Sequence, residues 1–73
     1  MELGKLIYEL RKKANLSQEQ LAEKVGVSRQ TISKWELGET APDIKQAQVL
    51  SQVFSVSLDE LTGNATKEVI YKK

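Results

Sequence analysis

The chain has 73 residues, enough for one small domain, and its 11 basic residues nearly balance its 10 acidic ones. It contains no cysteine and no histidine, which excludes disulfides, thiolate metal sites, a thiol nucleophile and the commonest general base. Because no apolar run approaches the roughly 18 residues of a membrane span and no signal peptide opens the chain, we predict a cytoplasmic binding module without metal, cofactor or enzymatic activity.

The first 14 or so residues have the i, i+3, i+4, i+7 apolar spacing of an amphipathic helix. Asn15 and Leu16 are expected to break this helix. Its other face is mostly charged, as solvated helix faces commonly are. The predicted inward face consists of Leu3, Leu6, Ile7, Leu10 and Ala14.

A second short helix is predicted to begin after Ser17. Ser17 and Gln20 have the Ser-x-x-Gln spacing of a capping box, in which each side chain bonds to the backbone of the other residue. Gly26 ends the helix, because glycine readily adopts the left-handed backbone conformation of a tight helix exit. The buried side is expected to hold Leu21, Ala22 and Val25.

The third predicted helix follows almost at once and extends over about residues 28–37. Ser28 is its expected N-cap, because a serine side chain can accept a hydrogen bond from the first free backbone N–H groups. Ile32 and Trp35 are predicted to be buried, and Gly38 to end the helix. The helix therefore has an apolar side and an opposite polar side.

A short acidic loop leads to the fourth predicted helix. Pro42 fits the first turn of this helix, where its missing N–H costs nothing, and Asp43 favours the positive helix start. A further capping box, formed by Ser57 and Glu60, opens a short fifth helix that closes at Gly63. The inward stripe of the fourth helix is expected to hold Ile44, Ala47, Leu50 and Phe54.

These elements predict an all-α fold, a compact five-helix domain over residues 1–63. Residues 64–73 have no periodic pattern, and we interpret them as a C-terminal tail that serves as a dimer arm or a linker. Within the domain, the second and third helices and the turn between them have the pattern of a helix-turn-helix unit. Ala22 is small where the two helices must cross closely, and Gly26 supplies the turn.

The segment LSQEQLAEKVGVSRQTISKWELG, followed by APD and VSLDEL, resembles the phage-repressor/Cro-type helix-turn-helix family of bacterial and phage transcription regulators, the xenobiotic-response-element type. The resemblance covers nearly the whole chain. It implies a lambda-repressor-like fold of five helices, dimeric binding to a near-palindromic DNA operator and no catalytic activity.

Particular positions match the family or depart from it. Arg11 and Glu36 match a partly buried ion pair, which by the resemblance supports the third helix rather than contacting DNA. Ser55 stands where the family often has glycine after the fourth helix. Residues 39–43 are acidic where several members carry basic residues, so contacts from this loop to the DNA backbone are not expected.

The polar side of the third helix is the predicted DNA-reading surface, since a helix fits the major groove with its N-terminal residues nearest the base edges. Arg29 suits bidentate pairing with guanine and Gln30 with adenine. Gln18 begins the second helix, whose backbone N–H groups suit a phosphate, and by the resemblance its side chain braces Arg29. The predicted DNA-binding residues are Gln18, Ser28, Arg29, Gln30, Thr31, Ser33 and Lys34.

Some of these residues also have a plainer interpretation. Ser28 is an N-cap first and a DNA contact second. Thr31 and Ser33 fit a solvated helix face as well as they fit a contact to a phosphate. Trp35 lies in the apolar pattern and belongs to the core rather than to a base-stacking surface.

A net charge of +1 predicts a local DNA-binding patch rather than binding through bulk charge. One such domain offers about three or four base-reading side chains, too few against the roughly 10⁶–10⁹ competing sites of a genome. We therefore predict a homodimer that binds an operator as a transcriptional repressor. The predicted dimer surface is residues 49–71, whose spare apolar groups are Val49, Val53, Val56, Leu58 and residues 69–71.

Two other functions fit parts of the sequence. The same fold serves as an antitoxin or another protein-interaction module, often with DNA binding retained, and a small protein partner that co-purifies would favour this alternative. A hydrolytic enzyme would need a carboxylate site such as Asp43, Asp59 and Glu60, but all three have the positions of acids at helix starts.

Overall fold

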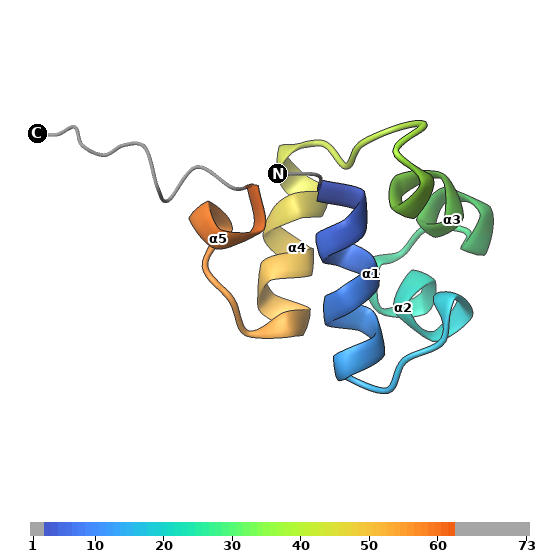
Figure 1. Ribbon diagram of the computed structural model, residues 1–73, viewed down its shortest axis with the longest axis horizontal. Coiled ribbons are helices and arrows are strands. Elements are labelled where there is room, and N and C mark those ends of the chain that lie inside the picture. Colours follow the sequence, from blue (N-terminus) through green and yellow to red (C-terminus); the bar gives the residue numbers. More distant parts are fainter. Residues whose placement is uncertain (1–2, 63–73) are drawn as a thin grey trace, which may run out of the picture.

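The computed structural model describes residues 3–62 (Figure 1). They form five α-helices: α1 (Leu3–Lys13), α2 (Gln18–Val25), α3 (Arg29–Leu37), α4 (Ile44–Phe54) and α5 (Leu58–Thr62). No strand occurs in this part of the chain, so the predicted all-α fold is confirmed. Gly63 and the predicted tail over residues 64–73 lie outside the described residues. None of the helices over residues 3–62 has the length and apolar character needed to span a membrane.

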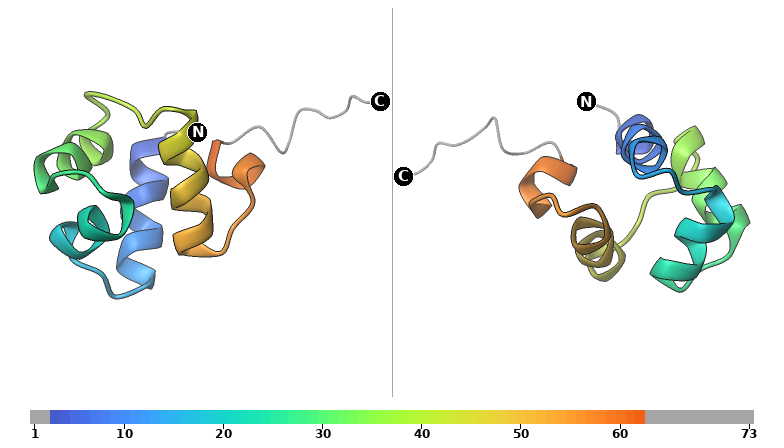
Figure 2. Two further views of the ribbon diagram at one scale, coloured as in Figure 1. Left: turned by 180° about the vertical axis from the view of Figure 1, so that it is seen from behind. Right: turned by 90° about the horizontal axis from the view of Figure 1, so that it is seen from below.

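The helix-turn-helix unit forms one end of the domain. α2 and α3 lie together at this end, and α5 lies at the opposite end (Figures 1 and 2). α3 packs against both α1 and α2, while α5 packs against α4 and α1. Contacts of α2 with α4 complete the enclosure of one core. This arrangement leaves the outer side of α3 without a neighbouring helix.

The core receives residues from every helix. Burial of apolar surface of this kind is the main force that stabilises a small domain. Ile32 and Trp35 anchor α3, since they are 0% and 2% exposed. The other buried apolar side chains are Ile7, Leu21, Ala22, Ala47, Leu50 and Leu61.

The predicted capping boxes and the first glycine helix end are present. Ser17 Oγ accepts a hydrogen bond from Gln20 N at 3.0 Å, and Gln20 Oε1 accepts one from Ser17 N at 2.8 Å. Ser57 and Glu60 form the same pair of bonds, each of 3.0 Å. Gly26 ends α2 with φ +86°, in the left-handed region that glycine enters most readily.

Several predicted core positions are corrected by the structure. Ala14 is exposed, because α1 ends at Lys13 and the chain turns away at Asn15, which has φ +60°.

Ile44 on α4 is also exposed, at 70%. Helical spacing places it beside Ala47, but no other helix covers this position of the first turn. Val25 and Phe54 are half-buried, and both pack against the core on the predicted sides of their helices.

The N-terminal end of α4 differs from the prediction, and its C-terminal end has a left-handed cap without glycine. Pro42 precedes the helix instead of occupying its first turn, because Asp43 is the N-cap and accepts a hydrogen bond from Gln46 N at 2.7 Å. At the other end, Ser55 is the C-cap with φ +57°. The position at which the family often has glycine therefore needs a left-handed backbone in this chain too.

Gly4 marks a close approach of α1 to the end of α3, for which the sequence carries no pattern. A Cβ atom there would meet the backbone carbonyl oxygens of Trp35 and Glu36, the latter at 2.8 Å. We expect Gly4→Ala to lower the free energy of unfolding by about 1–3 kcal/mol, because α1 must move away from α3. Urea denaturation measures the effect against Lys5→Ala at the exposed neighbouring position. Equal stability of the two variants would contradict this packing.

Candidate nucleic-acid interface

The turn between α2 and α3 fixes the position of the predicted reading helix. Gly26 N–H donates to the carbonyl oxygen of Ala22 at 2.8 Å, and Ala22 is buried at 3% exposure. Ser28 then caps α3, since its Oγ accepts a hydrogen bond from Thr31 N at 3.2 Å. Gly38 ends α3 with φ +79°. α3 is therefore bounded by caps that the sequence predicts at both ends.

The outer side of α3 is polar up to Lys34 and ends in the exposed Leu37, and the inner side belongs to the core. Burial of Trp35 confirms its interpretation as a core residue. Ser28 and Thr31 share a contact of 3.0 Å between their hydroxyl oxygens. The predicted DNA-binding residues between positions 28 and 34 differ in exposure: Ser28, Arg29, Gln30 and Lys34 are exposed, and Thr31 and Ser33 are half-buried.

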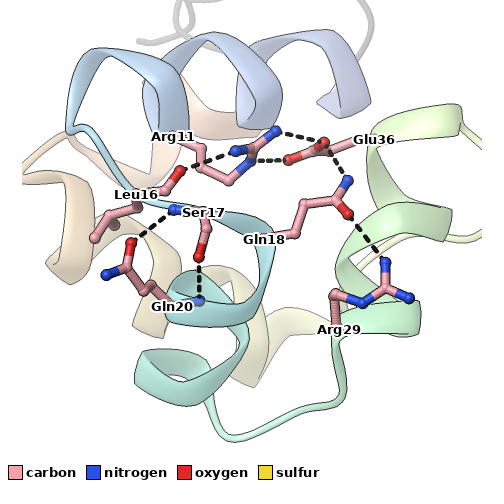
Figure 3. Close-up of polar contacts among 7 residues, drawn as sticks. All are labelled: Arg11, Leu16, Ser17, Gln18, Gln20, Arg29 and Glu36. Carbon is pink, nitrogen blue, oxygen red and sulfur yellow. Dashed lines mark hydrogen bonds and ion pairs between the residues drawn. The ribbon is translucent and has the colours of Figure 1, made fainter.

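A nearly buried ion pair ties α1 to the last turn of α3 (Figure 3). Arg11 Nε donates to Glu36 Oε2 at 2.6 Å and Arg11 Nη2 to Glu36 Oε1 at 3.2 Å. The third nitrogen, Nη1, donates to the carbonyl oxygen of Leu16 at 2.8 Å. The two charged side chains are only 9% and 7% exposed. The ion pair expected from the resemblance is confirmed, and it also holds the loop before α2.

Gln18 connects this ion pair to the reading side of α3 (Figure 3). Gln18 Nε2 donates to Glu36 Oε1 at 2.9 Å, and Gln18 Oε1 accepts a long hydrogen bond of 3.5 Å from Arg29 Nη1. The brace between Gln18 and Arg29 is thus present in the structure. Its link to Glu36 was not predicted, because a contact between the start of one helix and the end of the next has no spacing signal in the sequence.

An open hollow lies beside Gln18, between the end of α1, the start of α2 and Arg29. Lys12 contributes to its wall, and the exposed N-terminus of α2 borders it. Backbone N–H groups at a helix start carry partial positive charge and attract anions. The hollow therefore combines a helix start with the cationic side chains of Lys12 and Arg29 and the acidic side chain of Glu19, next to the outer side of α3.

The carboxylates considered for a hydrolytic site belong to helix starts. Asp43 caps α4, and Glu60 forms the capping box of α5. Asp59 lies in the first turn of α5. Within residues 3–62, no group of three or more His, Cys, Asp or Glu residues is placed to hold a metal ion.

Comparison of the sequence with known proteins identifies the family to which this chain belongs. A helix-turn-helix family model matches residues 7–61. The chain belongs to this family. The transcriptional activator BcrR of Enterococcus faecalis is 48% identical over 61 residues, which are 84% of this chain and 30% of BcrR. This chain thus spans less than a third of the length of that relative.

Two solved structures resemble this helix-turn-helix chain closely. The P22 c2 repressor in complex with a synthetic operator superimposes with a TM-score of 0.80 at 38% identity, covering 84% of this chain and 92% of that chain. A chain of the SinR–SinI protein complex superimposes with a TM-score of 0.78 at 30% identity, covering 94% of this chain and 68% of that chain. The predicted phage-repressor-like family and its five-helix fold are therefore confirmed.

Proposed function

We propose that this chain binds double-stranded DNA as a homodimer, reads the major groove with α3 and represses transcription. The observation that carries the proposal is the fixed orientation of α3. Ile32 and Trp35 are buried, so Arg29 and Gln30 stand exposed at the first two positions of the helix. These are the positions at which a helix in the major groove approaches the base edges.

The proposed contacts divide into base reading and phosphate binding. Arg29 pairs with guanine O6 and N7, and Gln30 with adenine N6 and N7. Lys34, one turn further along the exposed side, reaches another base or a phosphate. Gln18 and the start of α2 hold a phosphate at the adjoining hollow, where Lys12 adds positive charge.

The small residues of α3 have supporting roles in this proposal. Ser28 uses its Oγ to cap the helix, and that oxygen also lies 3.0 Å from Thr31 Oγ1. One hydroxyl of this pair can still donate to a phosphate oxygen, because each hydroxyl has one donor and two acceptor sites. Ser33 is half-buried and contacts DNA only at the edge of the groove.

The homodimer supplies the specificity that one domain lacks. Two copies double the number of base contacts and place two α3 helices about 34 Å apart, one turn of B-DNA. Residues 49–71 remain the proposed dimer surface, with Val49 half-buried on α4. Val53, Val56 and Leu58 pack partly against the core, so each offers only part of its surface to a partner.

Repression is proposed because the repressor chain resembles this one over most of its length. A cytoplasmic location follows from that activity, since the protein must reach DNA. The similarity to a chain of the SinR–SinI complex favours a second candidate function, a DNA-binding domain that also docks with a protein partner. Co-purification of a small protein from the native cell would support this second function.

Selection of bound duplexes from a random DNA pool, followed by sequencing, tests the proposal. We expect a near-palindromic site whose half-sites are centred about 10–10.5 base pairs apart or at a multiple of that spacing. Sedimentation of the enriched duplex with the protein should show two chains per duplex. A pool that stays random would contradict sequence-specific binding, and one chain on an unpaired half-site would contradict the homodimer.

A further inference from the structure

A continuous chain of polar contacts leads from the buried ion pair to the tip of Arg29 (Figure 3). It passes from Arg11 to Glu36, then to Gln18, and ends at the guanidinium of Arg29. Glu36 lies in the last turn of α3, whereas Arg29 is the first residue of that helix. Because its side chain is only 7% exposed, Glu36 is not available to contact DNA directly.

The chemistry of the groups gives this chain of contacts a direction. An ionised carboxylate only accepts hydrogen bonds, so the NH₂ group of Gln18 must face Glu36. The amide oxygen of Gln18 then faces Arg29, whose guanidinium only donates. The flipped amide would set its oxygen against the carboxylate and its NH₂ against the guanidinium, and both contacts would be repulsive. Glu36 therefore determines which end of the Gln18 amide Arg29 meets.

Arg11 keeps Glu36 in place for this role. Two guanidinium nitrogens of Arg11 bind the two carboxylate oxygens, which fixes the position of the Glu36 carboxylate. Oε1 of Glu36 accepts from Arg11 and from Gln18 at once. The remaining freedom of the Gln18 amide is therefore small.

We infer that Glu36 is a positioning residue for base selection, acting through Gln18 to hold Arg29 in the orientation that pairs with one base. The inference rests on the proposed function. Contact with Gln18 uses Nη1 of Arg29 and leaves its other N–H groups to donate to the base. A side chain held by one edge presents the fork geometry that guanine matches, whereas an untethered arginine also reaches phosphates and other bases.

The change Glu36→Gln keeps the size of the side chain but no longer fixes which end of the Gln18 amide faces position 36. An amide has both a donor and an acceptor end, so Gln18 can then face it in either orientation. When the new NH₂ group faces Gln18, Gln18 turns its own NH₂ group towards Arg29, and this contact pushes the guanidinium away. Glu36→Gln is therefore expected to relax the base preference at the position that Arg29 reads.

The test compares four duplexes: the one enriched from the random pool by the wild-type protein, and its three variants at the base pair where Arg29→Ala loses preference. The wild type should prefer its base pair by about tenfold or more, the scale of one bidentate contact. Glu36→Gln and Gln18→Met should each reduce the preference to about threefold or less, and the double variant should reduce it no further. Preference at the base pair that Gln30 reads should stay unchanged.

Ile7→Val is the control for lost stability, because it shortens a fully buried apolar side chain of α1 and touches none of the polar contacts between Arg11 and Arg29. It should melt at a lower temperature and keep the wild-type base preference. A folded Glu36→Gln protein that loses affinity equally for all four duplexes would overturn the inference and leave a purely structural role. If the DNA pool stayed random after selection with the wild-type protein, the proposed function as a whole would be overturned. If Glu36→Gln kept the wild-type preference for the base pair that Arg29 reads, only the role of Glu36 would be overturned.

Hydrogen exchange of side-chain amides in the free wild-type protein tests the fixed orientation of the Gln18 amide. This measurement does not depend on whether a variant folds. Gln20 and Gln46 are internal references, because their capping-box hydrogen bonds use the amide oxygen and not the NH₂ group. The NH₂ protons of Gln18 should exchange more slowly than those of both references. Equal exchange at the three glutamines would overturn the fixed amide orientation.

Discussion

Arg11→Ala is expected to lower the free energy of unfolding by about 3–5 kcal/mol, the scale for removing one partner of a buried ion pair. The loss is large because Glu36 would keep its charge at 7% exposure with only Gln18 as a remaining partner. The carbonyl oxygen of Leu16 would also lose the donor that lies 2.8 Å away. A typical domain is stable by about 5–15 kcal/mol, so this change removes a large part of the total.

Urea denaturation followed by far-ultraviolet circular dichroism measures this effect. Lys12→Ala is the control, because it removes the same charge from the same helix turn at an exposed position and should change stability by about 0.5 kcal/mol or less. Adding Glu36→Gln to Arg11→Ala should restore part of the lost stability, since the buried charge is then gone. Equal stability of the Arg11 and Lys12 variants would contradict the structural role of the ion pair.

The positions at which the helices begin and end were predictable from the sequence, because they depend on local chemistry. A serine at the start of a helix with glutamine or glutamate three residues later binds free backbone N–H groups whatever surrounds it, as Ser17 and Ser57 do. Gly26 and Gly38 end their helices for an equally local reason, their left-handed backbone. The inward direction of Ile32 and Trp35 followed from helical spacing, and it fixed the outer side of α3 as well.

Features that depend on neighbouring helices were not predictable in this way. Helical spacing gives the direction in which Ile44 points but not whether another helix covers it, and the side chain is 70% exposed. Gly4 looks like an ordinary helix residue in the sequence, yet its missing side chain allows α1 to approach the carbonyl groups that end α3. The hydrogen bond between Gln18 and Glu36 likewise depends on how α2 and α3 cross.

For the candidate site, the sequence predicted which residues face outward but not how they are held. Arg29, Gln30 and Lys34 are exposed as expected, because the core residues on the other side of α3 leave no alternative. The support of Arg29 by Gln18 came from the resemblance, and the support of Gln18 by Glu36 came only from the structure. Contact of these side chains with DNA stays a prediction.

Arg29→Ala is expected to cause the largest loss of DNA binding of any single change on α3. A bidentate contact between arginine and guanine contributes about 1–3 kcal/mol, and a homodimer loses it in both half-sites, so the total is about 2–6 kcal/mol per dimer. Folding should be unaffected, because Arg29 is exposed and, among residues 3–62, its side chain makes only the long 3.5 Å hydrogen bond with Gln18. The loss should be confined to the duplex with the preferred base pair, so that the preference among the four base pairs disappears.

Gel-shift titration of the enriched duplex and its single-base variants measures this effect. Lys24→Ala removes the same charge from the neighbouring helix, where the side chain lies near Ala14, Leu16 and Val53 rather than near Arg29. This control should weaken binding slightly on every duplex, through the general field of the protein, and should leave the base preference intact. If Arg29→Ala weakened binding to all duplexes by the same factor, the guanidinium would be a phosphate contact. Base selection would then have to come from the rest of α3, with Gln30 as the remaining N-terminal candidate.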